Sequence, residues 1–140
     1  MDKILVVNKG TCVNTAGYGT WEVCAYRNGS KIRITNGSED YTTTNTMELR
    51  AVVESFKLID TMTTEKTQKV IIYNQTDYVK WSLGSWVPTC VNKGEWTTNS
   101  GKPINNTGMW IELLNYLKKY PYISMRNVNE CANDDYMAIV

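Results

Sequence analysis

The residues that could carry chemistry in this chain gather in three short polar segments. They are residues 8–11, 45–48 and 74–77, which read Asn-Lys-Gly-Thr, Asn-Thr-Met-Glu and Asn-Gln-Thr-Asp. Each borders an apolar run, so each is expected at a strand end or a helix start, where the sites of mixed sheets form. The chain has no histidine, which removes the commonest general base and transition-metal ligand. Catalysis would therefore rest on carboxylates, lysine, tyrosine or a hard metal ion.

The cysteine pattern argues against a zinc site. No two of the cysteines form a Cys-x-x-Cys pair, and free thiols are expected in a reducing compartment. The four are Cys12, Cys24, Cys90 and Cys131. No apolar run approaches the roughly 18 residues that span a bilayer, and the apolar start of the chain is too short for a signal peptide. A cytoplasmic protein without a membrane partner is expected.

Length and charge limit the function classes. The chain has 140 residues, which suits one domain over residues 1–140. Its net charge is +1, whereas strong nucleic-acid binders usually carry a large basic excess. Any binding of nucleic acid is therefore expected to be weak or to depend on a local patch.

The first half of the chain predicts three strands, a helix and a further strand. Apolar and β-branched residues predict strands over residues 3–8, 18–27 and 31–35, and Asn28-Gly29 is a strong hairpin signal. Asn45 and Glu48 have the spacing of a capping box at the start of a long helix. Residues 69–73 predict a strand that is buried on both faces.

The second half alternates helices with a last strand. Helices are predicted over residues 77–86 and 107–119, with a polar loop or handle over 87–105 between them. A strand is predicted over residues 122–125 and a last helical turn or two over 134–140. This order predicts an α/β fold with a five-stranded mixed sheet, in which three antiparallel strands precede strand–helix alternation.

Four motifs in order resemble type 1 ribonuclease H. Residues 8–12, Asn-Lys-Gly-Thr-Cys, resemble the family's Thr-Asp-Gly-Ser-Cys, and residues 43–49 resemble Thr-Asn-Asn-x-Met-Glu-Leu. Residues 74–79 resemble Thr-Asp-Ser-Gln-Tyr-Val. In the handle, Trp86, Gly94-Glu95-Trp96 and residues 102–110 follow the family's order of Trp, Gly-x-Trp and Lys-Pro-Val-x-Asn-x-x-Leu-Trp. The resemblance runs from about Lys3 to about Ala138.

The resemblance implies a metal-dependent nuclease site in which two ligands have changed. The family cleaves the RNA strand of an RNA·DNA hybrid with two divalent metals held by four carboxylates. Those positions correspond to Lys9, Glu48, Gln75 and Asp135, with Asp134 as the fallback. Glu48 and Asp135 are thus the retained catalytic acids. We expect Lys9 to pair with Glu48, joined by Asp135, in place of a metal, so that no cofactor is bound.

Two changes of register would restore a metal site. Asn8 would stand in the first position if Lys9 were an insertion, and Asp77 would move into the third. In that case Glu48, Asp77 and Asp135 would hold Mg²⁺ or Mn²⁺. The segment 127–133 also lacks the Gly-His loop of the family.

The resemblance also implies which side chains contact nucleic acid. These residues match family positions that touch the hybrid, or lie where a stacking or phosphate contact is expected. They are Thr11, Cys12, Thr44, Asn45, Thr76, Trp86, Trp96 and Lys102. Packing within the handle explains Trp86 and Trp96 equally well, and we favour this interpretation slightly.

Three functions remain open from the sequence. The first is a pseudoenzyme that keeps the hydrolase fold and binds RNA·DNA hybrid or duplex RNA. The second is an active metal-dependent endonuclease with a rearranged site. The third is a module that binds a protein partner and has lost both properties. We rank the first and third close together, and the second below them.

Overall fold

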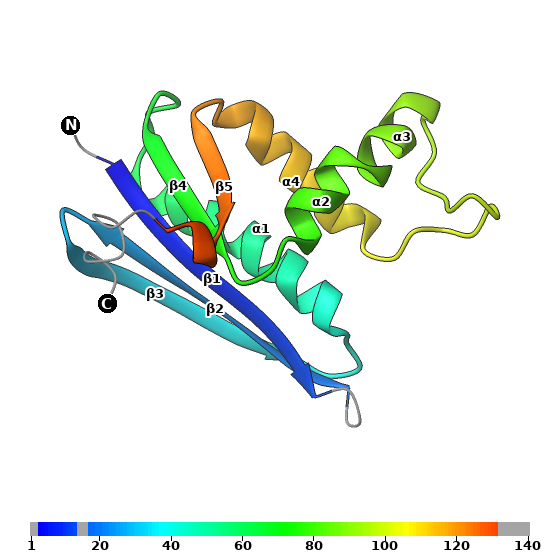
Figure 1. The fold of residues 1–140 in the computed structure, drawn as a ribbon, viewed down its shortest axis with the longest axis horizontal. Helices are drawn as coiled ribbons and strands as arrows, with labels where there is room; N and C mark the ends of the chain where they lie inside the picture. Colours follow the sequence, from blue (N-terminus) through cyan, green and yellow to red (C-terminus); the bar gives the residue numbers. More distant parts are fainter. Residues whose placement is uncertain (1–2, 14–16, 132–140) are drawn as a thin grey trace.

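A computed structural model describes residues 3–13 and 17–131 of the chain (Figure 1). The strands are β1 (Lys3–Val13), β2 (Tyr18–Arg27), β3 (Ser30–Glu39), β4 (Lys69–Asn74) and β5 (Ile123–Asn127). The helices are α1 (Thr44–Met62), α2 (Tyr78–Gly84), α3 (Trp86–Lys93) and α4 (Thr107–Lys119), and a 3₁₀ turn, Val128–Glu130, follows β5.

The strands form one sheet with β1 at its centre. The order is β3-β2-β1-β4-β5. The first three strands pair antiparallel, whereas β4 pairs parallel with β1 and β5 pairs parallel with β4. The predicted fold class is therefore confirmed: it is a five-stranded mixed sheet with helices.

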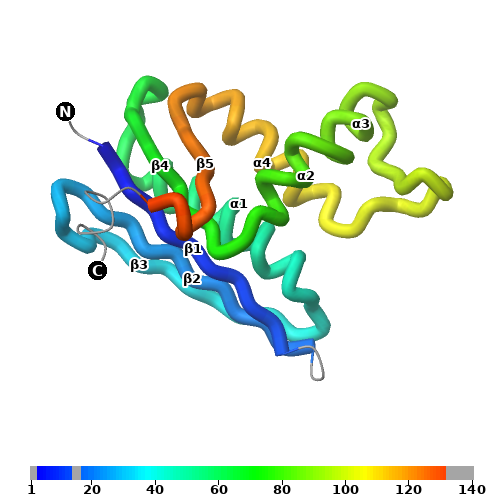
Figure 2. The backbone as a smooth tube through the Cα atoms, in the orientation of Figure 1, coloured from blue at the N-terminus to red at the C-terminus, as the bar shows by residue number. Residues whose placement is uncertain are grey.

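The helices make one layer against the sheet and one projection beside it. α1 packs along β1 and β2 and against α4, while α2, α3 and the segment 94–106 extend away from the strands (Figure 2). The interface of α1 with the sheet contains fully buried apolar side chains such as Val6, Val23 and Phe56. Phe56 also stacks on Tyr116 of α4, with ring centroids 5.3 Å apart.

Gly10 sets the distance between β1 and α1. A Cβ atom at this position would lie 2.5 Å from the backbone nitrogen of Glu48, and closer still to the carbonyl group of Met47. Only a residue without a side chain lets the strand pass so close to the helix start. The start of α1 is thereby held against the middle of the sheet.

The start of α1 differs from the predicted capping box. Thr43 is the N-cap, and its hydroxyl oxygen accepts a 3.2 Å hydrogen bond from the backbone N–H of Thr46. Asn45 and Glu48 lie inside the helix, so the capping-box prediction was wrong by two residues. Threonine is also a favourable N-cap residue, and three successive threonines left the position ambiguous.

The predicted handle contains a helix. The helix expected over residues 77–86 ends at Gly84, and α3 then runs through residues predicted as loop. Pro88 lies in the first turn of α3, where its missing N–H costs no helical hydrogen bond. Gly94 ends the helix in the left-handed conformation with φ of 69°. Polar composition alone therefore misled the prediction for residues 87–93.

Other boundaries are confirmed or extended by a few residues. The hairpin at Asn28-Gly29 is confirmed, since both residues have positive φ as a type I′ turn requires. The helix predicted over residues 107–119 is α4, with the same bounds. β1 and β3 are longer than predicted, because their ends pair with β2 although their sequence is polar. The helical turn predicted over residues 134–140 lies outside the described residues.

In the part of the chain that the structure describes, no helix has the length and apolar character needed to cross a membrane.

Replacement of Gly10 by alanine is expected to destabilise the protein by about 3 kcal/mol, because the added methyl group collides with helix backbone. The matched control is Gly108→Ala in α4, where a Cβ atom would meet nothing within 4 Å, and no loss is expected. Urea unfolding monitored by circular dichroism measures both. Equal midpoints for the two variants would contradict the importance of this contact.

Candidate functional site

The three polar segments meet where β1, β4 and the first turns of α1 come together. Gly10 contacts the backbone of Glu48. From the other side, the Thr76 hydroxyl donates a 2.6 Å hydrogen bond to Oε2 of Glu48. The end of β1 and the loop after β4 therefore both reach the carboxylate-bearing start of α1.

A buried amide network lies beneath this point. Asn8 and Asn74 are register partners on β1 and β4, and Nδ2 of Asn8 donates to Oδ1 of Asn74 at 2.8 Å. The same nitrogen donates to the hydroxyl of Ser55 on α1 at 3.1 Å. Both side-chain hydrogens of Asn8 are thus used inside the protein. Asn8 faces α1 and does not take the first metal position, so that alternative is wrong.

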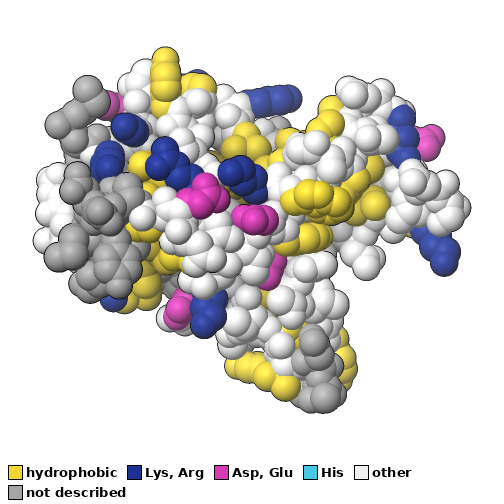
Figure 3. Space-filling model, in the orientation of Figure 1, with side chains coloured by type: hydrophobic (Ala, Val, Ile, Leu, Met, Phe, Trp, Pro, Cys, Tyr) yellow, Lys and Arg dark blue, Asp and Glu magenta, His cyan; other side chains and the backbone are white. Residues whose placement is uncertain are grey.

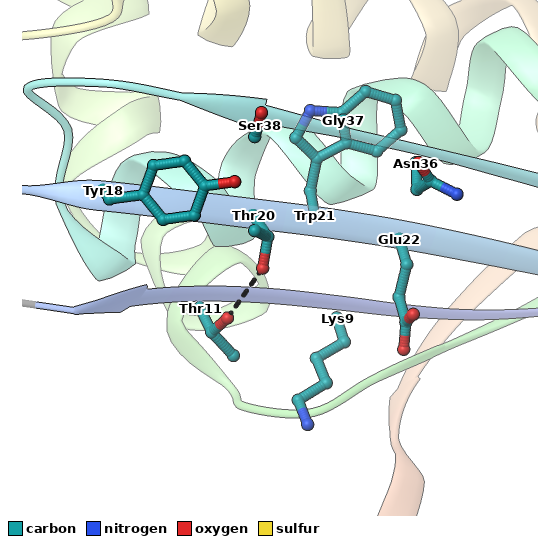
Figure 4. Close-up of a pocket in the computed structure, with 9 residues that line it drawn as sticks. All are labelled: Lys9, Thr11, Tyr18, Thr20, Trp21, Glu22, Asn36, Gly37 and Ser38. Atoms are coloured by element: carbon teal, nitrogen blue, oxygen red, sulfur yellow. Dashed lines mark hydrogen bonds between the residues drawn. The ribbon is translucent and has the colours of Figure 1, made fainter.

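Lys9 lies at an exposed position on the face of the sheet opposite α1. Strand residues alternate between faces, and Asn8 and Gly10 both face α1, so the Lys9 side chain leaves on the other side beside Glu22 (Figure 4). Within residues 3–13 and 17–131, no carboxylate oxygen lies within 4.0 Å of its ammonium group. The predicted Lys9–Glu48 ion pair is therefore not formed among the described residues.

Glu48 is half-buried and its charge is partly stabilised. Burial raises the pKa of its carboxyl group above the usual value, and the hydrogen bond from Thr76 opposes that rise. The Glu48 charge in turn raises the pKa of Tyr78, although burial is the larger cause. Glu48 therefore holds a proton more readily than a solvated glutamate does.

The loop after β4 presents polar side chains that point in different directions. Gln75, Thr76 and Asp77 are all exposed. Oδ1 of Asp77 accepts a 3.1 Å hydrogen bond from Asn127 at the end of β5. Asp77 is thus turned towards β5, while Thr76 is turned towards α1.

The donor set among the described residues does not fit a pair of divalent cations. Lys9, Glu48 and Gln75 supply one carboxylate, one neutral amide and one cation, whereas Mg²⁺ requires oxygen ligands with compensating negative charge. Within the described ranges, no three Asp, Glu, Cys or His side chains come together to hold a metal. Asp134 and Asp135, the sequence candidates for the fourth acid, lie outside those ranges.

The candidate nucleic-acid contacts of β1 and α1 surround the same point. Thr11 is exposed, and its hydroxyl lies 3.0 Å from that of Thr20. The Cys12 thiol donates to the carbonyl oxygen of Thr42, just before α1. Thr44 and Asn45 occupy the first turn of that helix, and Asn45 is exposed. Thr11 thus lies on the Lys9 face of the sheet, whereas Cys12 faces the start of α1.

The handle tryptophans pack rather than form an open platform. Trp86 lies edge-on to the buried Trp110, with ring centroids 5.0 Å apart. Trp96 is partly buried against the main apolar core. Lys102 remains exposed in the segment 94–106. Of these three candidate side chains, only Lys102 is exposed to solvent.

Sequence reasoning missed Trp81. Its side chain is 62% exposed on α2, and hydrophobic side chains gather over α2 on the face shown in Figure 3. Trp81 also borders a groove of about 630 Å³ between α2, α3 and the segment 94–106. The helical periodicity that places Val79 and Ser82 inwards would have identified Trp81 as outward-facing.

A mixed sheet in the order β3-β2-β1-β4-β5, with a glutamate of α1 held beside the ends of β1 and β4, defines a ribonuclease H-like fold. The RNase H family model matches residues 2–130. The chain belongs to the RNase H family.

Curated relatives carry the name ribonuclease H. The protein of Ehrlichia ruminantium (strain Gardel) is 33% identical over 114 residues, which cover 81% of this chain and 73% of that protein. The protein of Neorickettsia sennetsu (strain ATCC VR-367 / Miyayama) is 27% identical over 113 residues, covering 81% and 72%.

Solved structures show the same fold. LC9-RNase H1, described as a type 1 RNase H with the type 2 active-site motif, has a TM-score of 0.73 and 23% identity, covering 99% of this chain and 69% of that one. LC11-RNase H1, solved in complex with RNA/DNA hybrid, has a TM-score of 0.68 and 13% identity, covering 95% and 93%.

Replacement of Glu48 by glutamine is expected to stabilise the protein at pH 7, with a higher urea midpoint. The folded-state pKa of Glu48 is raised above 4.5, so the folded state binds more protons than the unfolded state. Stability contributed by this group therefore falls as pH rises from about 4.5 through the raised pKa. Glutamine removes that loss and still accepts the hydrogen bond from Thr76.

The stabilising effect should vanish near pH 3.5, where Glu48 is protonated in both states. Glu95→Gln, at an exposed glutamate of the segment 94–106, serves as the control and should leave the midpoint unchanged at both pH values. A gain of equal size at pH 3.5 and pH 7 would contradict the electrostatic explanation.

Proposed function

We propose that this RNase H family member binds RNA·DNA hybrid or duplex RNA and does not hydrolyse it by two-metal catalysis. The observation that carries the proposal is the placement of Lys9 and Gln75 where the family's motifs carry acids. Lys9 lies on β1 and Gln75 follows β4, on either side of the retained Glu48. The fold of the family is retained, whereas the negative charge of two metal-binding positions is replaced by Lys9 and Gln75.

Electrostatics supports the absence of a metal pair. An ammonium group about 4 Å from a divalent ion is repelled by roughly 8 kcal/mol at an effective dielectric constant of about 20. One carboxylate, already hydrogen-bonded to Thr76, does not offset a repulsion of that size. Lys9 and Gln75 therefore add no negative charge to that of Glu48.

The proposal includes the organisation and location of the protein. Residues 1–140 act as one domain, and the site is completed by Asp135, with Asp134 as the fallback. All four cysteines are free thiols, as is usual in reducing compartments, and a cytoplasmic location is part of the proposal. Hybrid is proposed as the ligand because LC11-RNase H1 and a foamy viral protease-reverse transcriptase were solved with RNA/DNA hybrid.

Hydrolysis is the second candidate function. It is favoured by the name ribonuclease H that the curated relatives share and by the retention of Glu48. Under this candidate, Glu48 and Asp135 hold Mg²⁺ or Mn²⁺, and Asp77 replaces the third acid. The hydrogen bond from Asn127 turns Asp77 towards β5, which ranks this candidate below binding alone.

A protein-interaction module is the third candidate. β3 forms an edge of the sheet, and its Ile32 and Ile34 are 43% and 56% exposed. Exposed apolar side chains on an edge strand are a site for strand pairing with a partner. Lys31 and Arg33 alternate with them, which is a pattern that discourages such pairing, so this candidate also ranks below binding.

Cleavage of a labelled RNA·DNA hybrid with Mg²⁺ or Mn²⁺ separates the candidates. The parent is expected to bind the hybrid without cutting it, whereas the Lys9→Asp, Gln75→Asp double variant is expected to cut, because two acidic ligands are restored. Adding Glu48→Gln to the double variant is the control and should abolish cleavage.

The alternatives give different results in the same assay. Cleavage by the parent that Glu48→Gln abolishes would show that the acids have rearranged, in favour of hydrolysis. A parent that neither binds nor cuts hybrid or duplex RNA would favour the protein-interaction module.

A further inference from the structure

Two polar rows cross the open face of the sheet next to the altered site. In each row, one residue from β1, one from β2 and one from β3 are register partners, so their side chains lie side by side. The first row is Lys9, Glu22 and Asn36, and the second is Thr11, Thr20 and Ser38. Together with Tyr18 they line a hollow of about 430 Å³ (Figure 4). That volume is within the usual range of small-ligand sites, about 300–1,000 Å³.

Among the residues that line this hollow, Lys9 supplies the positive charge. The side chain is exposed, and Glu22 beside it forms no ion pair with it at 4.0 Å or less. An ammonium group has three donors, and no hydrogen bond joins those of Lys9 to any side chain of residues 3–13 and 17–131. Within those ranges, its donors remain available for the oxygens of a ligand.

The threonine pair adds a further donor. The hydroxyl oxygens of Thr11 and Thr20 lie 3.0 Å apart, so one hydroxyl donates to the other. Two hydroxyl groups carry two protons, and their mutual hydrogen bond uses only one. The other proton can be donated to a ligand on the same face. Lys9 and Thr11 are two residues apart on one strand, about 7 Å, which the lysine stem can bridge.

We propose that Lys9 and the Thr11–Thr20 hydroxyl pair bind a backbone phosphate of the nucleic acid without a metal ion. A phosphodiester carries one negative charge and two free oxygens, which match one ammonium group and one hydroxyl donor. The inference rests on the proposed function, because it names the residues through which the backbone is held. Lys9 then supplies by itself the positive charge that a bound cation would supply at this edge of the sheet.

Glu22 limits the strength of the phosphate contact. Its carboxylate lies on the same face and in the same row as Lys9, so it repels an incoming phosphate. Weak binding follows, in agreement with a net charge of only +1. Replacing Glu22 by glutamine should strengthen binding, since the repulsion is removed and the shape is kept.

Fluorescence anisotropy with a labelled RNA·DNA hybrid, in EDTA and over a series of salt concentrations, tests the proposal. Lys9→Met is expected to weaken binding roughly five- to tenfold and to lower the slope of log K against log salt by about 1. Lys9→Arg should keep the slope. Lys118→Met on α4 is the matched control, because it removes one charge from an exposed lysine elsewhere on the protein, and less than a twofold change is expected.

The outcomes distinguish this inference from the proposed function. Hybrid binding by the parent, with equal losses for Lys9→Met and Lys118→Met, would overturn only the phosphate site. Binding by the parent that needs Mg²⁺ would overturn it as well. A parent that binds no nucleic acid would overturn both. Urea midpoints of the variants, expected to match the parent because Lys9 is exposed, verify that the changes act on binding.

Discussion

The close approach of Gly10 to the backbone of Met47 and Glu48 is the constraint on which the site depends. It holds the middle of β1 against the start of α1, and the alternation of the strand then decides which side chains face the helix. Asn8 points inwards and joins Asn74 and Ser55 in a buried network. Lys9 must therefore point outwards. The backbone contact at Gly10 thus determines that Asn8 is buried beneath the site and that Lys9 is exposed to solvent.

The separation explains how the charge of the site could change while the fold stayed the same. Lys9 and Gln75 are both exposed, so neither contributes to the packing that defines the sheet. The buried amides beneath them satisfy one another and need no ion. Belonging to the RNase H family therefore concerns the scaffold, whereas the exposed Lys9 and Gln75 can vary without changing its packing.

The sequence predicted the sheet, α4 and the meeting of the polar segments, because apolar periodicity and ordered motifs report directly on burial. The prediction failed where contacts between residues that are distant in the sequence determine the structure. The cap of α1 lay among several threonines, and α3 lay in a polar stretch whose helix is stabilised by packing of Val87 and Cys90. The predicted Lys9–Glu48 ion pair was wrong because a sequence alignment gives the position of a residue and not the direction of its side chain. Trp81 was missed because helical periodicity was used to find the buried positions of that helix and not its exposed ones.

The loop between β4 and α2 is anchored on two sides, through Thr76 to Glu48 and through Asp77 to Asn127. A loop tethered in this way has already lost much of its conformational entropy in the free protein. Ordering such a loop on a ligand costs little additional freedom, and preorganised surfaces retain more of their contact energy as affinity. The polar side chains of this loop therefore meet a ligand from a segment that is already partly ordered.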